Sequence, residues 1–101
     1  MFPADGETNV ATTSAIGVVF DEAVADSSVF EGSFRVWTHA GERVEGRYYV
    51  QENIVNFVPD TSFPDDTTIY VSLPAGGISD VMNNPLAETV DVRFGTGDRL
   101  R

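Results

Sequence analysis

The sequence contains no cysteine and no lysine. Without cysteine, disulfide bonds, thiolate metal sites and cysteine nucleophiles are all excluded. The six basic residues are all arginine and face 16 acidic residues, so the formal net charge is -10 at pH 7. A surface this negative repels phosphate backbones and anionic lipid headgroups, which argues against nucleic-acid and membrane partners. The charge favours solubility, and it also leaves open an attraction for divalent cations.

The chain also lacks an apolar run long enough to cross a bilayer. Phe2 is followed at once by Pro3 and Asp5, so we expect no secretory signal in this stretch. We therefore expect no membrane insertion. We interpret Met1 as a start added to an excised segment, and expect any export signal to lie elsewhere in a larger parent protein.

Apolar and polar residues instead alternate with a period of two, which predicts β-strands. The expected strands cover Thr13–Phe20, Ser33–Thr38, Val44–Val50, Ile54–Val58, Thr67–Leu73 and Glu88–Phe94. The side chains expected to face the core are Ile16, Val18, Phe20, Phe34, Val36, Val44, Gly46, Tyr48, Val50, Val55, Phe57, Ile69, Val71, Leu73, Val90, Val92 and Phe94. Turn signals every eight to twelve residues or so are typical of a sandwich. The sequence therefore predicts one all-β domain, an antiparallel β-sandwich of about seven strands.

The second and third expected strands can be paired in more detail. Matching their inward residues predicts a three-residue loop, His39–Gly41, whose glycine is left-handed. This register places Trp37 opposite Arg43 and Arg35 opposite Glu45. It predicts one cation–π pair and one ion pair, each worth roughly 0.2–1 kcal/mol.

Short motifs follow one another in a fixed order along the chain. They are Pro3, Asp5 and Gly6; Phe20, Glu22 and Val24; Phe57 and Pro59; Asp80, Asn84 and Leu86; and Phe94 and Thr96. In this order they resemble the bacterial immunoglobulin-like repeat of the S-layer (SbsA) type, a tandem module of secreted and cell-surface proteins. The resemblance implies one Ig-like domain over residues 2–96, with a linker or tail over residues 97–101.

The resemblance implies an architectural function rather than a reaction. We expect a non-catalytic spacer module in an exported bacterial protein, located outside the cell or on its surface, with a contribution to adhesion. Its expected partners are the neighbouring domains of the parent protein, and the isolated module is expected to be monomeric. The alternative is a ligand-binding module for a carbohydrate or another surface protein, with or without calcium.

Calcium is the only cofactor that the sequence leaves open. It prefers six to eight oxygen ligands, which carboxylates, amides and backbone carbonyls supply. Two loops offer such groups, and their candidate residues are Asp21, Glu22 and Asp26 in one loop and Asp80, Asn83 and Asn84 in the other. The structural alternative is that Asp80 and Asn84 bond the amides of their own turn.

Several large side chains fall opposite the core in the period-two count. They are Trp37, Tyr49, Tyr70, Ile54 and Val58. A contiguous exposed apolar group marks a contact surface, whereas scattered residues do not. We therefore hypothesise a partner surface around Trp37, Tyr49 and Tyr70. The alternative is that these residues are covered by loops or lie on different sheets.

Catalytic residues are not indicated by any motif. The single histidine, His39, lies in the predicted turn and is expected to be solvated there. Nucleophile elbows and glycine-rich phosphate loops are both missing from the sequence. We therefore expect no enzymatic activity.

Overall fold

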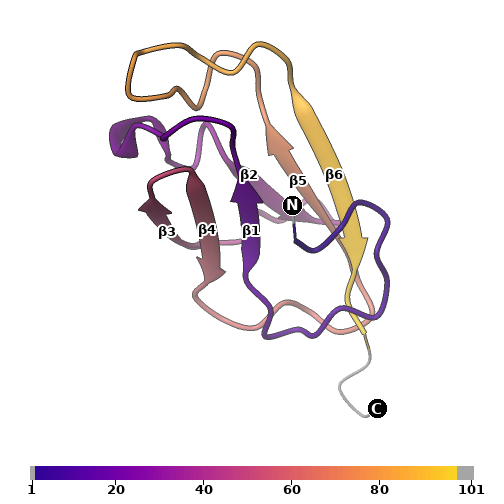
Figure 1. Ribbon diagram of the computed structural model, residues 1–101. Helices are drawn as coiled ribbons and strands as arrows, with labels where there is room; N and C mark the ends of the chain where they lie inside the picture. The colour runs from indigo at the N-terminus through magenta and orange to yellow at the C-terminus, as the bar shows by residue number, and fades with distance from the viewer. Residues whose placement is uncertain (1, 98–101) are drawn as a thin grey trace.

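The computed structural model describes residues 2–97 and contains two antiparallel sheets of three strands each (Figure 1). One sheet has the order β1-β4-β3 and the other the order β2-β5-β6. The strands are β1 (Ile16–Val19), β2 (Arg35–Thr38), β3 (Gly46–Gln51), β4 (Ile54–Pro59), β5 (Thr68–Leu73) and β6 (Val90–Gly95), with one short 3-10 turn, η1 (Asp26–Ser28). The predicted all-β, Ig-like antiparallel sandwich is confirmed.

The strands occupy nearly the predicted places, and single-residue bridges extend the pairing beyond them. One such bridge is parallel and joins Val10 to Thr96. Residues 98–101 of the predicted tail lie outside the described residues. Within the described residues, no helix is long and apolar enough to cross a membrane.

The core lies between the two sheets and follows the predicted alternation. In β4, for example, Val55 and Phe57 are fully buried while their neighbours along the strand are exposed. The buried apolar residues are Val10, Ile16, Val18, Val24, Phe34, Val36, Val55, Phe57, Phe63, Ile69, Val71, Leu73, Ile78 and Phe94. Alternate side chains from both sheets thus form one interior.

Val90 is a correction to the predicted core, because its side chain is 37% exposed. It is the first residue of β6, an edge strand. The N-terminal segment covers this edge only further along, where its hydrogen bonds reach Arg93 and Gly95. The start of β6 therefore has no neighbouring chain on its outer side among residues 2–97.

The predicted pairing around Gly41 holds only close to the turn. Gly41 has a φ of +88°, and Trp37 forms an antiparallel bridge with Arg43, as expected. The amide of Val44 then donates to the carbonyl of Val36 at 2.8 Å. Beyond this point the chain crosses to the other sheet, where β3 pairs with β4 instead of β2.

The predicted ion pair between Arg35 and Glu45 is therefore wrong. Arg35 lies opposite Ser72 of β5, because β2 pairs with that strand. Glu45 is instead 3.5 Å from the guanidinium of Arg43, which also forms an ion pair with Glu31. Because the chain crosses to the other sheet between β2 and β3, Arg35 and Glu45 do not face each other.

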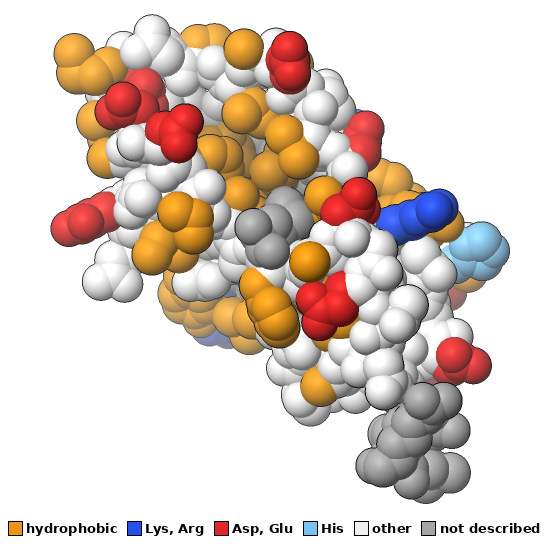
Figure 2. Space-filling model, turned by 45° about the vertical axis from the view of Figure 1, so that its right-hand side comes forward, with side chains coloured by type: hydrophobic (Ala, Val, Ile, Leu, Met, Phe, Trp, Pro, Cys, Tyr) orange, Lys and Arg blue, Asp and Glu red, His pale blue; other side chains and the backbone are white. Residues whose placement is uncertain are grey.

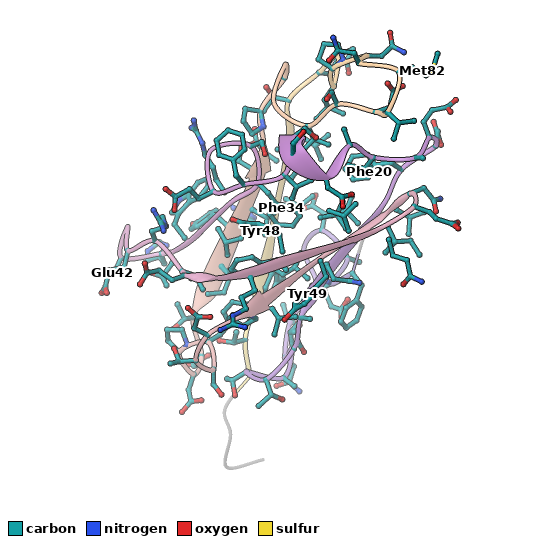
Figure 3. All side chains as sticks on the ribbon, turned by 90° about the vertical axis from the view of Figure 1, so that its left-hand side faces the viewer. Phe20, Phe34, Glu42, Tyr48, Tyr49 and Met82 are labelled. Carbon is teal, nitrogen blue, oxygen red and sulfur yellow. The ribbon has the colours of Figure 1, made fainter. Side chains whose placement is uncertain are left out.

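Three aromatic rings join the sheets at the centre of the core. The ring of Tyr48 in β3 lies 5.2 Å from that of Phe57 and 5.4 Å from that of Phe34, measured between centroids. Its hydroxyl donates to the carbonyl oxygen of Phe34 at 2.7 Å, and the two side chains are seen together in Figure 3. Burial raises the pKa of the Tyr48 hydroxyl. This hydrogen bond ties β3 to the residue that precedes β2 in the opposite sheet.

The N-terminal segment touches both sheets. Phe2 and Gly17 exchange two backbone hydrogen bonds of 2.8 and 2.7 Å on the outer edge of β1. Further along, residues 5–10 run parallel to the second half of β6, and Figure 1 shows this segment in indigo beside that strand. Hydrogen bonds join Gly6 to Arg93, Gly95 to Glu7, Val10 to Gly95, and Gly97 to Val10 at 2.7 to 3.0 Å. The segment therefore covers one edge of each sheet.

Candidate functional site

Three rings lie side by side on the outer face of the β2-β5-β6 sheet. Trp37 of β2 and Tyr70 of β5 are directly paired, with ring centroids 5.8 Å apart and planes 19° apart. His39 follows β2, and its ring lies 6.2 Å from that of Tyr70 at an interplanar angle of 25°. Its Nδ1 is 3.1 Å from the Tyr70 hydroxyl oxygen. We call Trp37, Tyr70 and His39 the aromatic row.

The aromatic row arises from strand geometry. In β2 the side chains of Val36 and Thr38 are buried in the sandwich, so Trp37 between them points to the outer face. In β5 Tyr70 likewise lies between the buried Ile69 and Val71. The antiparallel register then brings the two outward rings together, which is the arrangement that stabilises cross-strand aromatic pairs.

Arginine residues lie on both sides of the Trp37–Tyr70 pair. Arg43 forms a bridge with Trp37 on one side, and its guanidinium is occupied by Glu31 and Glu45. Arg93 of β6 is paired with Tyr70 on the other side. Within residues 2–97 the guanidinium of Arg93 has neither an ion pair nor a hydrogen bond.

A hollow of about 350 Å³ adjoins the aromatic row at its histidine end. It is lined by His39, Ala40, Asp66, Thr67 and Thr68. Figure 2 shows the histidine in pale blue on the rim of the molecule, next to a basic side chain in blue. The sheet face thus combines aromatic rings, hydroxyl groups, a carboxylate and a cation.

The structure splits the partner surface that the sequence predicted. Tyr49, Ile54 and Val58 are exposed by 53%, 38% and 42%, but they lie on the outer face of the β1-β4-β3 sheet. The aromatic row lies on the other sheet, on the opposite side of the sandwich. The period-two count identified outward residues correctly but could not say to which sheet each strand belongs.

The two predicted acidic loops meet at an apolar groove of about 280 Å³. Asp21, Glu22, Asp80 and Asn84 all line it, together with apolar residues such as Phe20 and Leu86. Figure 2 shows hydrophobic side chains in a hollow of the surface with acidic side chains around it. Of the remaining candidates, Asp26 begins η1, and Asn83 occupies the turn at a φ of +66°.

The carboxylate of Asp80 is engaged by its own turn. Its Oδ1 accepts hydrogen bonds from the amides of Met82 at 2.9 Å and Asn84 at 2.8 Å, and its Oδ2 accepts one from the Asn84 side chain at 3.2 Å. The Asn84 amide lowers the pKa of Asp80 more than any other group does. Residues 2–97 contain no group of three His, Cys, Asp or Glu side chains placed to hold a metal ion. The hydrogen bonds match the structural alternative, and calcium binding stays a prediction.

The Asp80 turn gives a prediction about pH. Because the folded pKa of Asp80 is lowered, its carboxylate stabilises the fold above the unfolded pKa, and this contribution is lost as pH falls through the folded pKa. Asp80→Asn should therefore lower Tm at neutral pH, and the difference from wild type should shrink towards about pH 2. Thermal unfolding at both pH values, with Asp91→Asn as the control for removing one acid, tests this. An Asp80→Asn difference of equal size at both pH values would contradict it.

Comparison with known proteins shows to which family the chain belongs. The family described as bacterial Ig-like domain matches residues 1–96. The chain belongs to this family. This confirms the resemblance that the motifs carried from Pro3 to Thr96. A search of curated proteins finds no match for this Ig-like domain.

Solved structures similar to this Ig-like domain are longer proteins. The LD-transpeptidase LdtMt1, in complex with imipenem, matches at 26% identity and a TM-score of 0.65, over 95% of this chain and 37% of that chain. The N-terminal part of the bacterial S-layer protein SbsC matches at 14% identity and a TM-score of 0.67, over 92% of this chain and 23% of that chain. L,D-transpeptidase 3 from Mycobacterium tuberculosis matches at 18% identity and a TM-score of 0.59, over 95% of this chain and 35% of that chain. This chain therefore spans well under half of each.

Proposed function

We propose that this Ig-like domain is a non-catalytic spacer that sets the distance between neighbouring domains of a bacterial surface or secreted protein. The similar solved structures support this, since the matched region is a minor part of each chain and one of them is an S-layer protein. The domain is also elongated, with principal extents of 45 × 22 × 20 Å. Such a shape adds length to a chain of domains.

The parallel pairing of residues 5–10 with β6 is the observation that carries the proposal. Force transmitted through neighbouring domains pulls the N-terminal segment and β6 in opposite directions along their length. The four backbone hydrogen bonds between them are then loaded together instead of one after another. A clamp in which several bonds must break at once resists extension better than any single bond of about 0.5–1.5 kcal/mol.

The hydrogen-bond partners of Asp80 and His39 are consistent with a non-catalytic function. The carboxylate of Asp80 is held by turn amides, and the His39 ring lies against the Tyr70 hydroxyl. Nucleophilic catalysis needs a nucleophile within hydrogen-bond reach of a base that a third group orients. Among residues 2–97 the His39 ring has no second hydrogen-bond partner that would orient it as a base.

Single-molecule force measurements test the spacer proposal, and the natural absence of cysteine makes the attachment points unambiguous. One variant carries cysteines at the exposed Ala4 and at Gly97, so that the clamp is sheared. A matched variant carries cysteines at Ala40 and Gly97, which lie at the same end of the sandwich beside Thr67 and Thr68. Pulling the second pair peels strands apart bond by bond.

We expect the first variant to unfold at a clearly higher force than the second, because forced unfolding reports the barrier and not the equilibrium stability. Equal melting temperatures for the two variants would serve as the control. Equal unfolding forces in the two directions would reject the clamp and, with it, the mechanical basis of the spacer function.

A further inference from the structure

We propose that the aromatic row and the hollow beside it bind an uncharged glycan chain. The aromatic row comprises Trp37, Tyr70 and His39 on the outer face of the β2-β5-β6 sheet. This inference goes beyond the spacer function and does not depend on it. It assigns a ligand class to the outer face of the sheet, whereas the four clamp hydrogen bonds lie along the edge of β6.

The aromatic row presents three rings on a face that faces away from the core. His39 is exposed, and Trp37 and Tyr70 are each only partly buried. The C–H groups of a sugar ring carry partial positive charge and are attracted to the negative face of an aromatic ring. Trp37 and Tyr70 stack on each other, as do Tyr70 and His39, so a sugar contacts the parts of the ring faces that this stacking leaves open.

The polar groups beside the row suit the hydroxyl groups of a sugar. The hollow of about 350 Å³ lies within the roughly 300–1,000 Å³ of small-molecule sites. Asp66 offers a carboxylate there and Thr68 a hydroxyl, while the Thr67 hydroxyl already donates to the carbonyl of Asp65 at 2.8 Å and can only accept. Arg93, paired with Tyr70 on the other side, offers a guanidinium without a partner in the described part of the chain. Donors and acceptors thus flank the apolar row, as recognition of a polyol requires.

The charge of the domain selects among glycans. A chain with a net charge of -10 repels polyanionic polysaccharides at long range. Two acidic residues accompany Arg93: Asp5, whose carboxylate accepts from the Arg93 backbone amide, and Asp91, two residues earlier on the same face of β6. Asp66 adds a further negative charge in the hollow. The surface therefore favours an uncharged glycan over an acidic one.

Trp37 makes the test direct, because it is the only tryptophan of the chain. We would titrate the domain with cellohexaose, mannohexaose and the hexamer of N-acetylglucosamine, and with an alginate hexamer as the acidic comparison. The expected result is a saturable change in tryptophan fluorescence with at least one uncharged oligosaccharide and none with alginate. For variants that lack Trp37, the Kd is measured by calorimetry instead of fluorescence.

Three variants locate the site, and a fourth serves as the control. Trp37→Ala and Tyr70→Leu should each raise the Kd about two- to tenfold, since an aromatic contact contributes on this scale. Arg93→Gln should raise it by a smaller factor. Tyr49→Ala, which removes an exposed ring from the other sheet, should leave the Kd unchanged. Circular dichroism checks folding, and if Trp37→Ala does not fold, Tyr70→Leu and Arg93→Gln decide.

Each remaining outcome overturns the proposal. Absence of binding to every uncharged oligosaccharide at about 10 mM rejects it, because that limit lies beyond even weak millimolar affinity. Preferential binding of alginate rejects the uncharged class. An equal loss of affinity in Tyr49→Ala moves the site to the other face. The force measurements above are unaffected by any of these results, so the two proposals fail separately.

Discussion

Replacement of Phe57 by alanine is expected to cost about 3–5 kcal/mol of unfolding free energy. The side chain is fully buried, stacks on Phe34 at 5.9 Å between centroids, and touches the ring of Tyr48. Its removal leaves a cavity between the two sheets and deprives Tyr48 of a packing partner. Single domains are stable by only about 5–15 kcal/mol, so this loss is a large share of the total.

Urea denaturation measures the effect, with Val58→Ala as the matched control. Val58 is the next residue of β4, but it points to the outer face and is 42% exposed. Its truncation should change the unfolding free energy by no more than about 0.5 kcal/mol. Similar losses in the two variants would mean that the alternation of β4 between core and solvent is wrong.

Gly46→Ala is expected to destabilise the domain by about 1–3 kcal/mol through overpacking. A Cβ at this position would collide with the carbonyl oxygen of Val58 and would lie 2.6 Å from the ring of Phe57. The first is backbone of the paired strand and the second is a core ring, so neither can move aside cheaply. Only glycine lets β3 approach β4 this closely.

Gly17→Ala provides the control, since it also adds a methyl group inside a strand. The nearest atom to its added Cβ is the side-chain oxygen of Asn56 at 2.9 Å, the end of an exposed side chain that can rotate away. Thermal and urea unfolding should show a much smaller change than in Gly46→Ala. A neutral or stabilising Gly46→Ala would show that the two strands can separate without cost.

The sequence was sufficient to predict the sandwich because alternation is a local signal. Residues such as Ile16, Phe57 and Phe94 were placed correctly, since a half-buried strand requires an apolar residue at every second position. The bridge between Trp37 and Arg43 was also predicted, because a tight turn fixes the register of the residues closest to it.

Assignment of strands to sheets was beyond the reach of that signal. Alternation gives the inward and outward side chains of a strand, but β2 and β3 have the same pattern whether they share a sheet or face each other. Tyr49 was therefore grouped with Trp37, although the sandwich separates them. Likewise, the local sequence around Asp21 and around Asp80 does not indicate that the two loops line the same groove.

The N-terminal segment has a consequence for how the domain tolerates trimming. Phe2 covers the edge of the β1-β4-β3 sheet by hydrogen bonding to Gly17, and Val10 covers the edge of the β2-β5-β6 sheet by hydrogen bonding to Gly95 and Gly97. Removal of the N-terminal segment up to Val10 would expose an edge of each sheet at the same time. Unpaired edge strands can pair with strands of other molecules and lead to aggregation. The short leading stretch thus protects the folded unit from strand addition by its own copies.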